Sequence, residues 1–190
     1  MQDERKEWDQ RYAPGTHGPT APDPFFVQAY EQFVAVAFPN GGEGLDVAGG
    51  LGRHAVWLAQ HGWRMSLIDI SEVGVQQARQ NALRAGVEID CNVHDLRSTS
   101  LPEERFDLVT VFFYLERTIF AQLAQTLRPG GLIVYKTYTS EALRRGYGPS
   151  HRMHLLEPNE LLKEFEGLRV LYYREPVEGN AVAELVARKR

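Results

Sequence analysis

The stretch Leu45-Asp46-Val47-Ala48-Gly49-Gly50-Leu51-Gly52-Arg53-His54-Ala55 decides the fold of this 190-residue chain. An apolar run leads into closely spaced glycines, and a segment with helical spacing of its apolar residues follows them. This order predicts a strand, a tight turn and a helix. Glycine in such a turn leaves bare backbone at the N-terminus of the helix, where a ligand can approach closely. We therefore interpret the turn as a ligand site.

Short apolar runs alternate with amphipathic stretches beyond this turn. The run at residues 108–113 is apolar on both faces, which is typical of a parallel strand covered by helices. Strands are predicted at residues 44–48, 64–70, 88–95, 106–114 and 132–139. Helices are predicted from Asp23-Pro24 to before residue 39, at residues 53–60, 72–84 and 117–127, and from Glu157-Pro158 to Gly167.

The C-terminal part of the chain has a different pattern. Residues 168–177 and 181–188 predict two strands across the short turn 178–180, so this pair must be antiparallel. The predicted fold class is α/β, with a doubly wound, mostly parallel sheet, helices on both faces and a C-terminal antiparallel hairpin. Such a hairpin is an uncommon end for a dinucleotide-binding fold.

Composition and the N-terminal pattern predict the domain organisation. With 43% apolar and 24% charged residues, the chain has enough material for one core. Residues 13–19 are rich in proline and glycine and cannot hold a regular helix or strand. We predict a mobile arm or lid over residues 1–22 and a single domain over residues 23–190.

Charge and cysteine content narrow the partners and the compartment. The net charge of −4 lacks the basic excess by which nucleic-acid binders attract phosphate. The single cysteine, Cys91, cannot close an intrachain disulfide and lies outside any CxxC pair, so no metal site is expected. No apolar run approaches the roughly 20 residues of a membrane span, and residues 1–7 are too charged for a secretion signal. We expect a cytoplasmic monomer or homodimer without nucleic-acid or membrane partners.

Acidic residues beside the predicted strand ends indicate the kind of ligand. Asp46 precedes the glycine turn, where a carboxylate would repel a pyrophosphate and favour a positively charged ligand such as S-adenosylmethionine. Asp69 follows the next strand and can accept both hydroxyls of a ribose, since Ser71 is available to cap the helix behind it. Asp95 can accept from an adenine amine. The alternatives are a solvated acid for Asp46 and a turn acid for Asp95.

A second interpretation of the glycine turn is a nicotinamide dinucleotide site. Residues 50–55 match the GxGxxA fingerprint, and Asp69 lies about 17 residues beyond Gly52, close to the spacing of a ribose-binding acid. Asp46 and the C-terminal hairpin disfavour this interpretation. An NAD(P)-dependent oxidoreductase and a non-catalytic cofactor-binding regulatory protein remain alternatives.

The chain resembles class I S-adenosylmethionine-dependent methyltransferases, and within them the small group related to tellurite-resistance and thiopurine methyltransferases. The resemblance rests on the acid and glycines at residues 46–52, the acid at position 69, the pair 95–96, the strand 106–115 and the Arg-Pro-Gly-Gly turn within 127–134. It implies a seven-stranded Rossmann-like methyltransferase fold. The implied cofactor-binding residues are Trp8, Asp46, Ala48, Gly50, Gly52, Arg53, Asp69, Ile70, Asp95, Leu96 and Phe112.

The resemblance also gives the N-terminal arm a role. Trp8 and Tyr12 share one face of a helical turn, and the family implies that this face closes over the methionine end of the cofactor. An exposed amphipathic arm is the alternative. Arg53 has two interpretations, a contact with the cofactor carboxylate and a cap on the sheet edge.

The methyl acceptor is expected beyond the fourth and fifth strands. Methyl transfer is an in-line displacement, so the protein mainly positions and desolvates a small-molecule nucleophile. This acceptor should lie near Phe113, Tyr114, Arg117, Tyr138 and the loop at residues 140–156. This loop has no acid between Glu141 and Glu157, which suits an anionic or thiolate acceptor, although a solvated basic loop is the alternative. Its basic residues are Arg144, Arg145, His151, Arg152 and His154. An Asn/Asp-Pro-Pro-aromatic element, typical of base methylation, is missing after the fourth strand. The candidate catalytic residues are Tyr12, His151 and Arg152.

Overall fold

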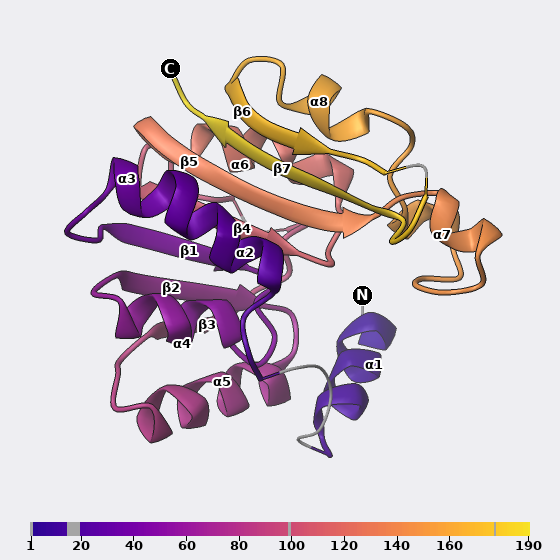
Figure 1. Ribbon diagram of the computed structural model, residues 1–190. Coiled ribbons are helices and arrows are strands. Elements are labelled where there is room, and N and C mark those ends of the chain that lie inside the picture. The colour runs from indigo at the N-terminus through magenta and orange to yellow at the C-terminus, as the bar shows by residue number, and fades with distance from the viewer. Residues whose placement is uncertain (1, 15–19, 99, 177) are drawn as a thin grey trace. The chain divides into compact units, whose positions relative to one another are not determined.

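The structure is a computed structural model that describes residues 2–14, 20–98, 100–176 and 178–190. It divides into two compact units, Met1–Ser100 and Leu101–Arg190 (Figure 1). The units are described in turn.

The first unit contains three parallel strands in the order β3-β2-β1: β1 (Glu43–Val47), β2 (Arg64–Asp69) and β3 (Asp90–Val93). Helix α4 (Arg53–Gln60) connects β1 to β2, and α5 (Glu72–Arg84) connects β2 to β3. Both helices pack against β2. Buried side chains such as Leu45, Val47 and Leu67 fill the space around these strands, as expected for a parallel sheet.

Two helical segments precede β1. Helix α1 (Gln2–Tyr12) packs along α5 (Figure 1). Helix α2 (Pro24–Ala29) begins at Asp23, whose side chain accepts a hydrogen bond from the Phe25 N–H at 2.9 Å, as the Asp-Pro pair predicts. It continues through a π-helical turn, η1 (Tyr30–Val34), into α3 (Ala35–Ala37).

The second unit contains β4 (Phe106–Phe112), β5 (Leu127–Tyr138), β6 (Arg169–Arg174) and β7 (Val182–Arg188). Strands β4 and β5 are parallel, whereas β7 is antiparallel to both β5 and β6. The connecting helices are short: η2 (Arg117–Ile119), α6 (Phe120–Gln125), α7 (Glu141–Arg144), η3 (Arg152–His154) and α8 (Glu160–Glu164).

The strand order β3-β2-β1-β4-β5-β7-β6 confirms the predicted fold class, a seven-stranded, mostly parallel sheet that ends in an antiparallel hairpin. The boundaries of several elements differ from the prediction. Strand β5 begins at Leu127 rather than at residue 132 and includes the Arg-Pro-Gly-Gly segment, because a bulge shifts its register against β4 between Phe106 and Leu108. The helix predicted at 117–127 therefore ends at Gln125.

Two further boundaries follow from local chemistry. Helix α8 begins at Glu160 rather than at residue 157, after Asn159 in a left-handed conformation. Strand β6 ends at Arg174, just before Glu175-Pro176, since proline cannot donate to a strand ladder. The mobility of the arm over residues 1–22 and the single domain over residues 23–190 stay predictions.

Candidate functional site

The glycine turn after β1 runs through left-handed backbone. Ala48 and Gly50 have φ of 52°, and Gly52, which precedes α4, has φ of 77°. A side chain at position 50 would place its Cβ 2.6 Å from the Tyr12 hydroxyl oxygen. Ala48 keeps the turn without the usual glycine, at a cost of about 1–2 kcal/mol for a left-handed residue with a Cβ. Two features therefore define this turn, its left-handed backbone and the close contact of Gly50 with Tyr12.

Asp46 is buried inside the turn, with an exposed fraction of 1%. Its Oδ2 accepts a hydrogen bond from the Ala55 N–H in the first turn of α4, at 3.3 Å. The alternative of a solvated acid at the strand end is therefore wrong. The carboxylate joins the end of β1 to the start of α4, and this contact holds the glycine turn in place.

Asp69 lies at the end of β2 and is 4% exposed. One carboxylate oxygen accepts from the Gly50 N–H at 2.8 Å and the other from the Ser71 N–H at 2.9 Å. Burial raises the pKa of this carboxyl, and the backbone N–H donors oppose that shift. The Ile70 N–H is a third backbone donor to this carboxylate, and since two ionised oxygens offer about four acceptor positions, capacity for a further donor is left.

Ser71 caps α5, as the sequence predicts. Its hydroxyl oxygen accepts from the Gly74 N–H at 3.0 Å. Because Ser71 caps the helix, Asp69 is not needed as the cap, and one of its carboxylate oxygens accepts from the glycine turn. Ser71 also donates to Asp9 of α1 at 2.5 Å, a contact that the sequence analysis missed.

Helix α1 lies over this edge of the first unit and is held at several points along its length. Asp9 also accepts from the Val73 N–H at 3.2 Å, and the Gln77 side-chain amide donates to the Tyr12 carbonyl at 2.8 Å. Glu4 forms an ion pair with Arg97. The only sequence signal for this docking was the position of Asp9 between the two aromatic residues of the arm.

Tyr12 of α1 lies against the glycine turn, and the Trp8 ring lies beside it. Their rings stack with centroids 5.4 Å apart, which confirms the predicted shared face. Tyr12 is 8% exposed, and a Cβ at Gly74 would lie 2.9 Å from its ring. Burial raises the pKa of Tyr12, and the nearby Asp69 carboxylate raises it further. The phenol therefore stays neutral at physiological pH and is suited to donate a hydrogen bond rather than to accept a proton.

Asp95 forms a turn with Arg97. Its carboxylate accepts from the Arg97 backbone N–H at 3.0 Å and pairs with the guanidinium at 3.4 Å. The turn-acid alternative is therefore present in the structure, and an adenine contact by Asp95 stays a prediction. Leu96 beside it is buried, and Ile70 after β2 is half-buried.

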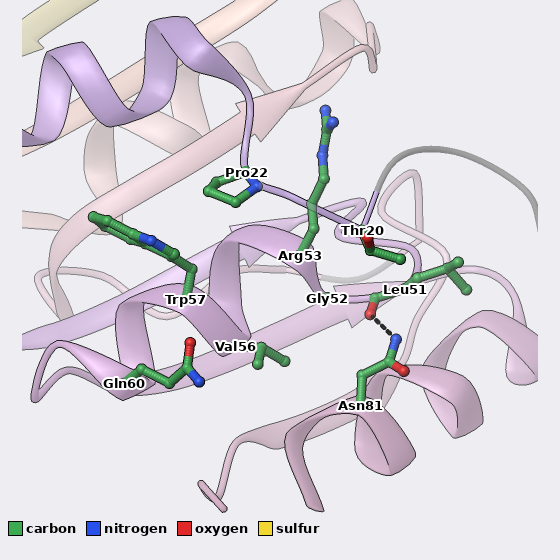
Figure 2. A pocket seen from close by; sticks show the side chains of 9 residues that line it. All are labelled: Thr20, Pro22, Leu51, Gly52, Arg53, Val56, Trp57, Gln60 and Asn81. Atoms are coloured by element: carbon green, nitrogen blue, oxygen red, sulfur yellow. Dashed lines mark hydrogen bonds between the residues drawn. The ribbon is translucent and has the colours of Figure 1, made fainter. Parts of the chain in front are cut away.

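A pocket of about 290 Å³ opens between α4, α5 and the segment that precedes α2. Figure 2 shows Arg53 and Trp57 rising from α4 beside Pro22, and the Asn81 side chain donating to the Leu51 carbonyl at 3.0 Å. The pocket includes Gly52 and Arg53 of the predicted site. Its lining residues are Thr20, Pro22, Leu51, Gly52, Arg53, Val56, Trp57, Gln60 and Asn81.

The remaining predicted residues belong to the second unit. Phe112 is buried at the end of β4, and His151 and Arg152 are exposed at the start of η3. Arg152 pairs with Glu157 at 3.0 Å, a contact with the acid just outside the basic stretch. Likewise, Arg144 pairs with Glu141 at 3.0 Å. Both arginines thus pair with an acid at the edge of the basic stretch, and a role of this stretch in acceptor binding stays a prediction.

Within the described ranges, no group of His, Cys, Asp and Glu side chains is arranged to hold a metal ion. None of the helices in the described part of the chain has the length and apolar character that crossing a membrane requires.

Comparison with known proteins places the glycine turn in a family. Residues 45–131, from β1 into β5, match the family described as "Methyltransferase domain". This segment of the chain is therefore similar to methyltransferase domains. The match contains the glycine turn, Asp69 and Asp95, which are the residues on which the predicted resemblance rests.

Two curated relatives match the chain over part of their length. An S-adenosyl-L-methionine-dependent Diels-Alderase, iccD of Talaromyces variabilis, is 30% identical over 63% of this chain and 44% of its own. A tRNA 5-carboxymethoxyuridine methyltransferase of Escherichia coli K12 is 31% identical over 52% of this chain and 41% of its own. The chain thus spans less than half the length of these curated relatives.

Among solved structures, the N-methyltransferase NodS from Bradyrhizobium japonicum WM9, crystallised with S-adenosyl-l-homocysteine, superposes with a TM-score of 0.71. It is 20% identical, and the alignment covers 97% of each chain. The chain therefore has the same fold as this protein.

Proposed function

We propose that this protein is an S-adenosylmethionine-dependent methyltransferase that acts on a small-molecule acceptor. The observation that carries the proposal is the hydrogen bond between Asp69 at the end of β2 and the Gly50 N–H of the glycine turn. It holds an acid and bare backbone together at the carboxyl edge of parallel strands, where open α/β sheets bind ligands. The methyltransferase-domain match over residues 45–131 supports the same assignment.

The residues of the first unit fit a nucleoside cofactor with a positive charge. Asp69 offers acceptor capacity for ribose hydroxyls, and a Cβ at Gly50 would fill the space against Tyr12. Trp8, Arg53, Ile70, Asp95 and Leu96 would contribute to the same cofactor site. When bound, S-adenosylmethionine supplies an electrophilic methyl group on a sulfonium.

In this proposal, the side chains of the protein bind and orient the cofactor and the methyl acceptor. Tyr12 is held neutral by burial and by the Asp69 carboxylate, so it would donate a hydrogen bond within the site. His151 and Arg152 are proposed on the acceptor side, with the guanidinium of Arg152 already paired to Glu157. The proposed acceptor is a thiol, an oxyanion or a similar small nucleophile.

The net charge of −4 supports a small-molecule acceptor over a nucleic acid. The Escherichia coli relative is a tRNA methyltransferase, so tRNA belongs among the acceptors to be tested. The acceptor assay below distinguishes a small-molecule acceptor from tRNA.

The deciding experiment is calorimetry with S-adenosylmethionine, S-adenosylhomocysteine and NADH, followed by transfer of a labelled methyl group to thiols, phenols, selenite, tellurite and tRNA. We expect both sulfur ligands to bind, NADH not to bind, and at least one small molecule to accept the methyl group. Binding of NADH alone would establish a dinucleotide enzyme. Binding of S-adenosylmethionine without transfer to any acceptor would indicate a non-catalytic protein, and transfer to tRNA alone would overturn the small-molecule assignment.

A further inference from the structure

Asn81 of α5 contacts the middle of the glycine turn. Its side-chain amide donates a hydrogen bond to the Leu51 carbonyl at 3.0 Å, across 30 positions of the chain (Figure 2). Leu51 lies between Gly50 and Gly52, which both have left-handed backbone. The bond therefore joins a side chain of the first unit to the turn that we propose as part of the cofactor site.

The Leu51 carbonyl lies just before the first regular hydrogen bond of α4. Gly52 is the N-cap of this helix, and its carbonyl accepts from the Val56 N–H at 2.8 Å. A carbonyl that precedes the N-cap is outside the hydrogen-bond pattern of the helix. Asn81 supplies a donor to this carbonyl from a different helix.

The second contact of the Asn81 amide fixes which way the amide faces. Its oxygen accepts from the Arg84 guanidinium at 3.1 Å, and a guanidinium has donors only. The amide nitrogen must therefore face Leu51, whose carbonyl can only accept. An aspartate at this position would keep the contact with Arg84 and lose the bond to Leu51.

A planar peptide unit transmits the contact into the turn. The Leu51 carbonyl and the Gly52 N–H belong to one peptide unit, so a bond that fixes the carbonyl also fixes the direction of the N–H. The Gly52 N–H closes the turn by donating to the Gly49 carbonyl at 2.9 Å. Asn81 therefore acts on the backbone of the glycine turn through Leu51.

Packing holds only part of this side of the turn. Helix α5 comes close at Gly52, where a Cβ would lie 3.0 Å from the Ala78 Cβ. Beside this contact, Leu51, Gly52 and Asn81 line the pocket of about 290 Å³, so side chains do not fill the space next to the turn. A segment that borders open space has fewer packing contacts to keep it in place, and a directional hydrogen bond then matters more.

We infer that Asn81 is a positioning residue for cofactor binding. Its amide, acting through the Leu51 carbonyl, holds the glycine turn in the conformation that binds S-adenosylmethionine. The inference rests on the proposed function and adds to it a residue that neither the glycine pattern nor the acids at the strand ends indicate.

The test compares binding of S-adenosylmethionine to variants of the full chain by calorimetry. Asn81→Asp has nearly the same shape, but it replaces the donor with a carboxylate oxygen that faces the Leu51 carbonyl. Its Kd should rise about threefold to tenfold, the range of one hydrogen bond. Asn81→Ala removes the bond without adding repulsion. Since alanine favours helices, this variant should stay folded while its Kd rises about threefold.

The matched control is Gln80→Glu. Gln80 is exposed on α5 one residue before Asn81, and the substitution adds the same charge as Asn81→Asp. The control should bind like the parent protein. Asn81→Gln keeps an amide donor on a longer side chain and should recover part of the affinity that Asn81→Ala loses. A purely structural role of Asn81 would lower the melting temperature without this order of affinities.

Amide hydrogen exchange, followed by NMR without ligand, measures the effect inside the turn. The Gly52 N–H should exchange faster in Asn81→Asp and Asn81→Ala than in Gln80→Glu, because its peptide unit is no longer held from α5.

The inference is overturned if Asn81→Asp and Asn81→Ala bind S-adenosylmethionine as tightly as the control does, or if the Gly52 N–H exchanges equally fast in all variants. Failure of the parent protein to bind S-adenosylmethionine would reject the proposed function, and the inference with it. The two failures are distinguishable, because only the first occurs in a protein whose parent binds the cofactor.

Discussion

Asp69 has a structural contact in the fold and a proposed role in cofactor binding. It joins the end of β2 to the glycine turn through the Gly50 N–H, and its carboxylate can accept further donors. We expect Asp69→Ala to weaken S-adenosylmethionine binding at least tenfold, because charge-assisted hydrogen bonds of about 1.5–3 kcal/mol are lost. Calorimetry measures the loss. Asp90→Asn, an exposed acid on β3, is the control and should bind normally.

The buried environment of Asp69 also predicts a pH dependence. Its folded-state pKa is raised by burial, so protonated Asp69 stabilises the fold at low pH, and that contribution is lost as the pH rises through the raised pKa. Ribose binding requires the carboxylate. Affinity for S-adenosylmethionine should therefore fall on acidification, beginning above the usual aspartate range near about pH 4. A titration series checks this expectation, and an acid limb that persists in Asp69→Asn would contradict it.

Gly50 and Gly62 provide a matched pair for the glycine turn. Both have positive φ, but a Cβ at Gly62 would meet nothing within 4 Å, whereas one at Gly50 would meet the Tyr12 hydroxyl. Gly62→Ala should cost about 1–2 kcal/mol for the left-handed backbone, and Gly50→Ala should cost more, because its Cβ also presses on the Tyr12 hydroxyl. Only Gly50→Ala should also weaken cofactor binding. Denaturant unfolding and calorimetry separate the two effects, and equal behaviour of the pair would reject a ligand role for the turn.

At the scale of elements, α1 is the segment whose role depends most on its contacts. Asp9 of α1 accepts hydrogen bonds from Ser71 and Val73 at the N-terminus of α5, and Gln77 of α5 donates to the Tyr12 carbonyl. These bonds hold Tyr12 against the glycine turn. Removal of residues 1–20 should leave a folded core, because α2 begins only at Pro24 with its cap at Asp23. Methyl transfer should fall, since the cofactor would lose its cover.

A single substitution tests the same element without shortening the chain. Asp9→Asn weakens the bonds to Ser71 and Val73, so Tyr12 should become more exposed and its pKa should move down toward the ordinary value. Ultraviolet titration of tyrosine measures that shift, with Glu7→Gln on the exposed side of α1 as control. Full activity in the truncated protein would show that α1 is not a lid.

At the scale of the whole molecule, cofactor binding should appear as stability. A ligand that binds only the folded state at one hundred times its Kd adds about 2.7 kcal/mol to the free energy of unfolding. S-adenosylmethionine should therefore raise the melting temperature, and NADH should not. Hydrogen exchange should show the protection within residues 20–98, where the glycine turn and Asp69 lie. A stabilisation of equal size by NADH would contradict the assignment.

Local chemistry allowed much of this protein to be predicted from its sequence. Three features depend on contacts within a few residues and could therefore be predicted from local sequence patterns. They are the Asp-Pro start of α2, the Ser71 cap of α5 and the glycines after β1. The alternation of strands and helices, and the short turn before β7, likewise indicated the fold class. The acid at position 69 was expected beside the glycine turn because parallel strands end at a common edge.

Tertiary structure alone decided the contacts between residues far apart in the chain. Asp9 meets Ser71 across 62 positions and Arg117 meets Glu160 across 43, so neither pairing is written in a local pattern. The long β5 depends on a bulge opposite β4, and the positive φ of Phe113 depends on its bond to Lys136. The sequence by itself determined the fold class and indicated the glycine turn as a ligand site, because these follow from short-range periodicity and spacing. Ion pairing between side chains arises only when the chain folds, and it decided that Arg117 and Arg152 have acidic partners.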